Sequence, residues 1–98
     1  DFGWNDVGSF DALDALVPGD DAQNHAIVSP DVPVAPIFVR ATRNIVCQSG
    51  TQVVAALGVE DLVIAVTPDA VLVLPRERAQ EVRDIVARLT AGGHDRYL

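Results

Sequence analysis

One acidic residue near the start of the chain has neighbours that suit a ligand site. Asp6 lies in the stretch Phe2-Gly3-Trp4-Asn5-Asp6-Val7-Gly8-Ser9-Phe10, which holds the single tryptophan of the chain. Small residues beside an acid leave the backbone free to turn and let a ligand approach closely. Carboxylates and substrate phosphates are the ligands that Mg²⁺ prefers. Asp6 is therefore a candidate Mg²⁺ ligand, and the alternative is a turn aspartate between two core anchors, Trp4 and Phe10.

The remaining reactive side chains give weaker signals. Cys47 is the single cysteine and lies in an apolar run, which favours a buried core thiol over a nucleophile and excludes a disulfide within the chain. Glu60, Asp61 and Asp69 could form a carboxylate pair, but they fall at turn positions, where acids are common. The sequence assigns no catalytic residue and no nucleotide-binding residue.

The motif around Asp6 resembles the Phe-x-Trp-Ser-Asp-Val-Gly-Ser-Trp segment of the mannose-1-phosphate guanylyltransferases, members of the sugar-phosphate nucleotidyltransferase superfamily. Residues 58–73 are similar to the Gly-Val-Glu-Asp-Leu and Thr-Pro-Asp-Ala run of that family, and residues 78–82 to its Arg-Ala-Gln-x-Val. Asn5 and Phe10 replace the usual serine and tryptophan, and neither change removes the carboxylate. The resemblance implies that Asp6 helps to hold the catalytic metal against the nucleotide and sugar phosphates.

The same resemblance implies the activity of a longer parent protein. Such a parent would transfer a guanylyl group from GTP to mannose 1-phosphate, with Mg²⁺, and release pyrophosphate to give GDP-mannose. That reaction requires cationic groups and a glycine-rich loop around the triphosphate. The chain has no lysine, and Gly92-Gly93 follows a predicted helix, so no such loop is present in it. We therefore expect a C-terminal fragment that is inactive alone.

Two alternatives to this activity remain open. The chain could be a non-catalytic β module that serves oligomerisation or regulation of whatever domain precedes it. It could also belong to a sister nucleotidyltransferase that uses another sugar or nucleotide, since the choice of mannose and guanine rests on the resemblance alone.

Composition and charge restrict the class of protein further. The chain has 98 residues, 49% of them apolar, which is the size of one small domain and excludes intrinsic disorder. Without an apolar run of about 18 residues or a signal peptide, we expect a soluble, cytoplasmic protein. All of the net charge of −7 lies in residues 1–31, which carry seven acids and no arginine. This balance argues against nucleic acid or an anionic membrane as a partner.

The sequence divides into three predicted parts. Residues 1–19 are expected to be the tail of a catalytic domain, with a short helix that begins at Ser9 and stops at Pro18-Gly19. Residues 20–36, with Pro30, Pro33 and Pro36, are predicted to be a linker. His25 lies there without other ligands at metal spacing, so we expect an exposed linker histidine. Residues 37–98 are predicted to form a C-terminal β module with a terminal helix.

The β module shows a regular series of short strands. Runs rich in β-branched residues occupy 37–40, 44–48, 52–57, 62–67 and 70–74, with turn residues between them. Residues 53–62 also align with residues 63–72 as a weak ten-residue repeat. Two copies are too few for a solenoid, so a meander is the plainer interpretation. The resemblance favours a β-helix-like stack, the form of the C-terminal module in that family.

A longer helix is predicted from Pro75 to Ala91, because Ala79, Val82, Val86 and Leu89 recur at intervals of three and four. Gly92-Gly93 should end it, and His94 in the polar tail is given no role. The fold class is therefore α+β and mostly β. The strands are apolar at consecutive positions, so both faces of the sheet should be covered. We expect the helix on one face and the catalytic domain or a second copy on the other, and the resemblance implies a homodimer.

Overall fold

The computed structural model of the chain describes Trp4, residues 19–94 and Arg96. The described strands are β1 (His25–Val28), β2 (Ile37–Val39), β3 (Ile45–Gln48), β4 (Ala55–Leu57), β5 (Leu62–Val66) and β6 (Val71–Pro75). The 3₁₀ helix η2 (Arg76–Glu81) and the helix α2 (Val82–Ala91) follow them. The five predicted strand runs coincide with β2 to β6 and are confirmed. The helix predicted to begin at Ser9 lies outside the described residues.

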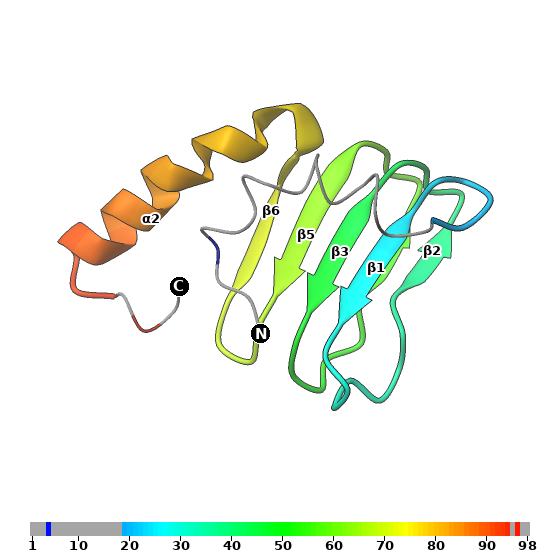
Figure 1. Cartoon of the computed structure of the whole chain (residues 1–98), viewed down its shortest axis with the longest axis horizontal. Coiled ribbons are helices and arrows are strands. Elements are labelled where there is room, and N and C mark those ends of the chain that lie inside the picture. Colours follow the sequence, from blue (N-terminus) through cyan, green and yellow to red (C-terminus); the bar gives the residue numbers. More distant parts are fainter. Residues whose placement is uncertain (1–3, 5–18, 95, 97–98) are drawn as a thin grey trace.

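The strands form two sheets, and from β1 to β5 no strand pairs with the next one in sequence (Figure 1). A four-stranded sheet has the order β1-β3-β5-β6, and a two-stranded sheet pairs β2 with β4. The β1–β3, β3–β5 and β2–β4 pairs are parallel, and β6 returns antiparallel to β5. A meander would pair each strand with the next one, so that alternative is wrong for β1 to β5. The chain instead winds coil upon coil, as a β-helix-like stack does.

The pairing register shows which positions are equivalent in successive coils. His25 pairs with Ile45, and Ile45 pairs in turn with Val63. On the small sheet Ile37 pairs with Ala55. Each coil contains two strands and two turns, so residues 53–62 and 63–72 each cover only about half a coil. The predicted ten-residue repeat is therefore not the structural repeat.

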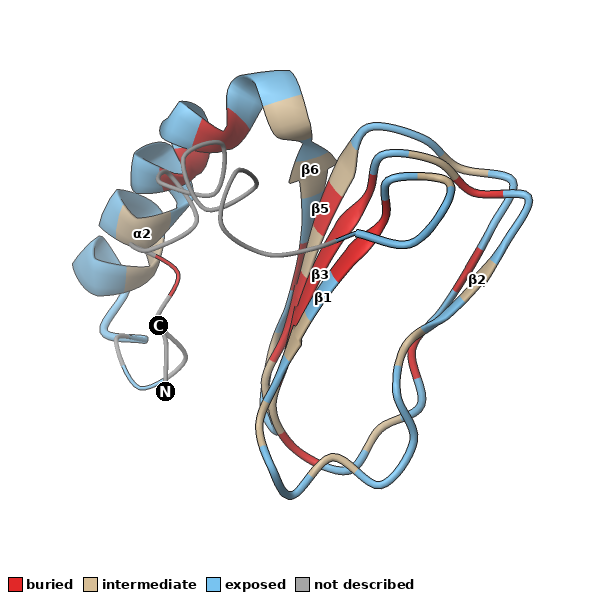
Figure 2. Ribbon diagram, turned by 45° about the vertical axis from the view of Figure 1, so that its right-hand side comes forward, coloured by how far each residue is buried: buried red, intermediate tan, exposed pale blue. Residues whose placement is uncertain are grey.

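Two hydrophobic layers hold the coils together, because alternate residues of a strand point to opposite faces of the sheet. One layer, which we call the helix-side core, consists of Trp4, Ile45, Cys47, Val63, Ala65, Leu72, Ala79 and Val82. The other layer, the inner core, consists of Val46, Val54 and Val66 with Phe38 and Ile64 packed against them. Figure 2 shows α2 on one side of the four-stranded sheet and β2 on the other.

The inner core corrects one prediction. Both faces of the central strands are covered, as the consecutive apolar residues predicted, and η2 and α2 cover one of them. The second face was expected to meet a catalytic domain or another copy. Val54 of the chain itself, just before β4, packs with Val46 and Val66 on that face instead. The winding of the chain brings β2 and β4 back over its own sheet.

The predicted terminal helix is confirmed, with two local features. Its first part, η2, is a 3₁₀ helix that starts after Pro75, whose φ of −65° suits a helix entry. Its end has a left-handed Gly93 at φ +76°, with the His94 N–H donating to the Leu89 carbonyl at 2.7 Å. The N–H groups of Gly92 and Gly93 likewise donate to the carbonyls of Arg88 and Thr90. The helix therefore ends with its last carbonyls hydrogen-bonded, as predicted from Gly92-Gly93. Neither helix of the described part has the length and apolarity to cross a bilayer.

The stretch 20–36, predicted to be a linker, contains strand β1, which pairs with β3 along its whole length. The prediction that His25 is exposed is wrong, because this residue is only 8% exposed within that strand. Local composition could not show this pairing, since the partner strand lies a full coil further along the chain. The division into 1–19, 20–36 and 37–98 stays a prediction.

Candidate functional site

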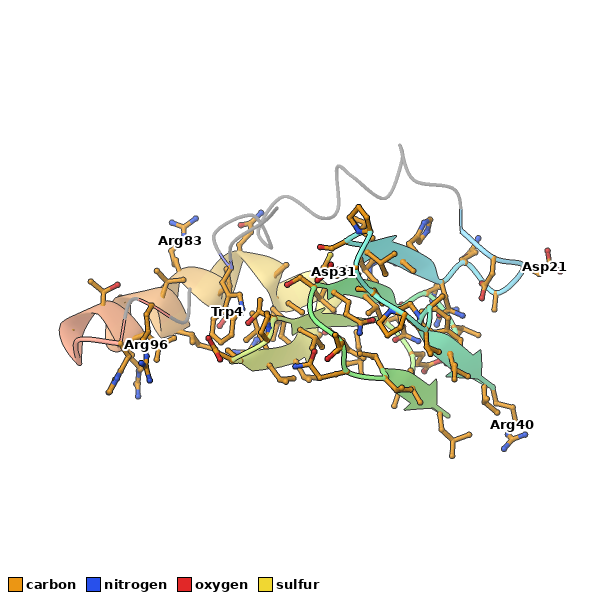
Figure 3. All side chains as sticks on the ribbon, turned by 90° about the horizontal axis from the view of Figure 1, so that it is seen from below. Trp4, Asp21, Asp31, Arg40, Arg83 and Arg96 are labelled. Atoms are coloured by element: carbon orange, nitrogen blue, oxygen red, sulfur yellow. The ribbon has the colours of Figure 1, made fainter. Side chains whose placement is uncertain are left out.

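Asp6, the one residue predicted to bind a metal, lies outside the described residues, as does Phe10. Trp4 of the same motif is described, is 5% exposed and belongs to the helix-side core. This burial agrees with the alternative interpretation for Trp4, a core anchor, and does not test that interpretation for Asp6 or Phe10. In Figure 3 its side chain lies where the helix meets the four-stranded sheet. Trp4 is therefore part of the core that lies between the sheet and the helix.

The described residues do not add a metal cage of their own. Among them, no group of three or more histidine, cysteine, aspartate or glutamate side chains lies close enough together to hold a metal ion. Mg²⁺ in phosphate sites commonly takes only one or two carboxylates and completes its octahedron with substrate phosphates and water. Asp6 as a ligand and Mg²⁺ as the cofactor both stay predictions, because Asp6 lies outside the described residues.

A polar cluster of the described residues lies at one corner of the coils, just before β1, β3 and β5. Gln23, Arg43 and Asp61 occupy equivalent positions there, all in the left-handed backbone region, with φ of 64°, 57° and 58°. The Arg43 N–H donates to the Ala22 carbonyl at 3.0 Å, which joins the first corner to the second. Because the corner repeats in each coil, side chains that are one coil apart in sequence come together.

Arg43 binds the acids of the next coil at this corner. Its Nε donates to Asp61 Oδ1 at 2.8 Å and its Nη2 to Asp61 Oδ2 at 3.0 Å, a two-point contact. The same Nη2 lies 3.3 Å from Glu60 Oε2. The hydrogen bond from Arg43 holds the pKa of Asp61 below its usual value, and Asp61 raises the pKa of Arg43. Glu60 and Asp61 therefore act as paired turn residues here, which fits their predicted turn positions.

An open pocket of about 540 Å³ lies beside this corner. It is lined by Gly19, Asp20, Gln23, His25, Arg43, Asp61 and Arg76. Asp20 accepts hydrogen bonds from the backbone N–H groups of Ala22 and Asn24, and the second of these is the main cause of its lowered pKa. Arg76 Nη1 donates to the Arg43 carbonyl at 3.1 Å. Asp20 and Arg76 thus form hydrogen bonds with backbone groups of the turns between strands, so these two pocket residues stabilise the turns.

The sequence did not reveal this corner, although it carries a signal. Asn24 and Asn44 are one coil apart, each directly before a strand, and both are buried. Arg43 precedes the acidic pair Glu60-Asp61 by one coil. A search for polar residues that recur at the length of one coil would have found both features.

Cys47 is the one cysteine of the chain, and it does not belong to a reactive site. It is 1% exposed in β3 and contributes to the helix-side core. Burial raises the pKa of its thiol to about 12, so the nucleophilic thiolate is scarce at neutral pH. The predicted buried core thiol is confirmed.

Comparison with known proteins gives one consistent result. Residues 36–89 match the family model of the MannoseP isomerase/GMP-like beta-helix domain. Mannose-1-phosphate guanylyltransferases from Klebsiella pneumoniae and Escherichia coli are each 40% identical over 97 residues, which is 99% of this chain. A crystal structure of mannose-1-phosphate geranyltransferase from Thermus thermophilus superposes with a TM-score of 0.64 at 34% identity, over 81% of this chain.

The match covers nearly all of this chain but a small part of each relative. The chain spans 19% of the length of those two guanylyltransferases and 22% of the Thermus thermophilus chain. The wound strands, the matched residues 36–89 and the structural likeness agree with one another. On this basis, the chain belongs to the MannoseP isomerase/GMP-like beta-helix domain family.

Proposed function

We propose that this chain is the C-terminal β-helix part of a mannose-1-phosphate guanylyltransferase. The observation that carries the proposal is the 40% identity to enzymes of that name along 99% of the chain. The parent would transfer a guanylyl group from GTP to mannose 1-phosphate in the cytoplasm, with GDP-mannose and pyrophosphate as products. The chain alone would not catalyse this reaction.

In this proposal Asp6 is the contribution of the chain to the reacting groups. A phosphate oxygen of mannose 1-phosphate attacks the α-phosphorus of GTP, and the bond from that phosphorus to pyrophosphate breaks. Mg²⁺, when bound, neutralises charge on the phosphates. The Asp6 carboxylate would supply one oxygen ligand and fix where that charge is neutralised. Positioning and charge stabilisation provide most of the catalysis in phosphoryl transfer.

The test is a pyrophosphate-release assay on the full-length parent with GTP, mannose 1-phosphate and Mg²⁺. Asp6→Asn keeps the size of the side chain and removes its charge. We expect kcat to fall on the order of a hundredfold, because loss of one charge-stabilising group typically costs that much. Calorimetric titration with Mg²⁺ in the presence of GTP should show weaker binding by the same variant.

Asp31→Asn is the matched control, because this acid lies in the exposed part of the proline-containing segment. It should leave both turnover and Mg²⁺ binding unchanged. Equal activity of the Asp6→Asn variant and the parent would mean that Asp6 is a turn residue, with the family activity intact. A parent without turnover on any sugar phosphate and nucleotide would favour the alternative, a non-catalytic module for oligomerisation or regulation.

We also propose that the parent is a homodimer through this module. The support is a set of exposed apolar side chains on and beside the small sheet: Ile37, Val39, Val53 and Leu57. Clustered exposed apolar residues are typical of association surfaces. Leu57, 62% exposed, is the best position for a test. Leu57→Asp should shift sedimentation of the parent from dimer to monomer, whereas Thr51→Asp in an exposed turn should not.

A further inference from the structure

We draw no further inference here: the strongest candidate, the apolar groove between the edge strand β6 and α2 that is lined in part by Val73, Val82 and Ile85, carries nothing because no feature of the described residues shows what covers it.

Discussion

Asn44 is hydrogen-bonded to Asn24 of the preceding coil at two points. Its backbone N–H and its Nδ2 donate to the Oδ1 of Asn24, at 3.0 and 3.1 Å. Asn44 in turn accepts from the Leu62 N–H at 3.0 Å and donates to the Val59 carbonyl at 3.1 Å. Both asparagines are buried, at 3% exposure for Asn24 and 0% for Asn44. This short asparagine ladder satisfies backbone groups at the coil corners, among them the N–H of Leu62 at the start of β5.

Replacing Asn44 by alanine should destabilise the chain strongly. The change removes its side-chain bonds to Asn24, Val59 and Leu62. Asn24 Oδ1 keeps the bond from the Asn44 N–H and the Val59 carbonyl keeps the bond from the Thr42 N–H, whereas the Leu62 N–H loses its acceptor. A buried polar group that loses its partner costs about 1–3 kcal/mol, so we expect a loss of roughly 2–3 kcal/mol. Thermal unfolding should show a fall in Tm of more than about 10 °C. Thr51→Ala, at an exposed turn, is the control, and an equal effect of both changes would rule out a stabilising role of the ladder.

The Arg43–Asp61 pair should make stability depend on pH in the acid range. The hydrogen bond from Arg43 lowers the pKa of Asp61 in the folded chain. The pair therefore stabilises the folded chain fully when the pH is above the unfolded-state pKa of Asp61, about 3.9. This stabilisation is lost as the pH falls through the lower pKa of Asp61 in the folded chain. Asp61→Asn keeps a residue that tolerates the φ of +58° and removes the charge. In urea titrations at pH 6, the free energy of unfolding should be lower for Asp61→Asn than for the unchanged chain, and this difference should disappear toward pH 2.

A double-mutant cycle separates this pair from other effects of acid. At pH 6, Arg43→Ala should lower the free energy of unfolding by the same amount as Asp61→Asn. The double variant should be little less stable than either single variant. Both side chains are exposed, so 1 M salt should also reduce these differences in stability. A difference that persists at pH 2 would assign the effect to packing and not to charge.

Arg40 carries backbone strain that the next coil avoids. It has φ +49°, and Gly58 occupies the equivalent position one coil later at φ +69°. A side chain in the left-handed region costs about 1–2 kcal/mol, and glycine is free of this cost. Arg40→Gly should therefore stabilise the chain by up to about 1 kcal/mol in urea unfolding. Gly58→Ala should destabilise it by a similar amount, although no atom lies within 4 Å of the added Cβ.

A glycine inside a helix gives the matched comparison for this pair. Arg83→Gly replaces an exposed arginine of α2, where glycine costs about 1 kcal/mol. The same substitution should thus stabilise at residue 40 and destabilise at residue 83. Destabilisation at both positions would show that the strain at Arg40 is relieved by contacts of its side chain.

The buried Cys47 thiol should report on opening of the helix-side core. Because burial raises its pKa to about 12, alkylation by iodoacetamide at pH 8 should be on the order of a thousandfold slower in the folded chain than in urea. Mass spectrometry of the alkylated chain measures both rates, and Cys47→Ala is the unlabelled control. Rapid labelling of the folded chain would contradict the buried position of the thiol.

Local properties of the chain were sufficient to predict most of its elements. The β-branched runs near Ile45 and Leu62 became strands because such residues fit a pleated, half-buried surface. The recurrence of Ala79 and Val82 at helical spacing predicted the buried face of η2 and α2. Cys47, within an apolar run, was predicted to be buried. All these properties are contained in a short window of sequence.

The tertiary structure alone decided how the coils meet. Parallel pairing between successive coils buried His25 in a stretch with the composition of a linker, and it brought Arg43 to Asp61. Winding of the chain also brought Val54 over the inner face of the sheet, where a separate partner had been expected. No short-range pattern encodes these contacts, because each depends on the length of a whole coil. The sequence by itself therefore determined the strands, the helix and the family motif, and the stacking of the coils determined the polar corner and the setting of Trp4.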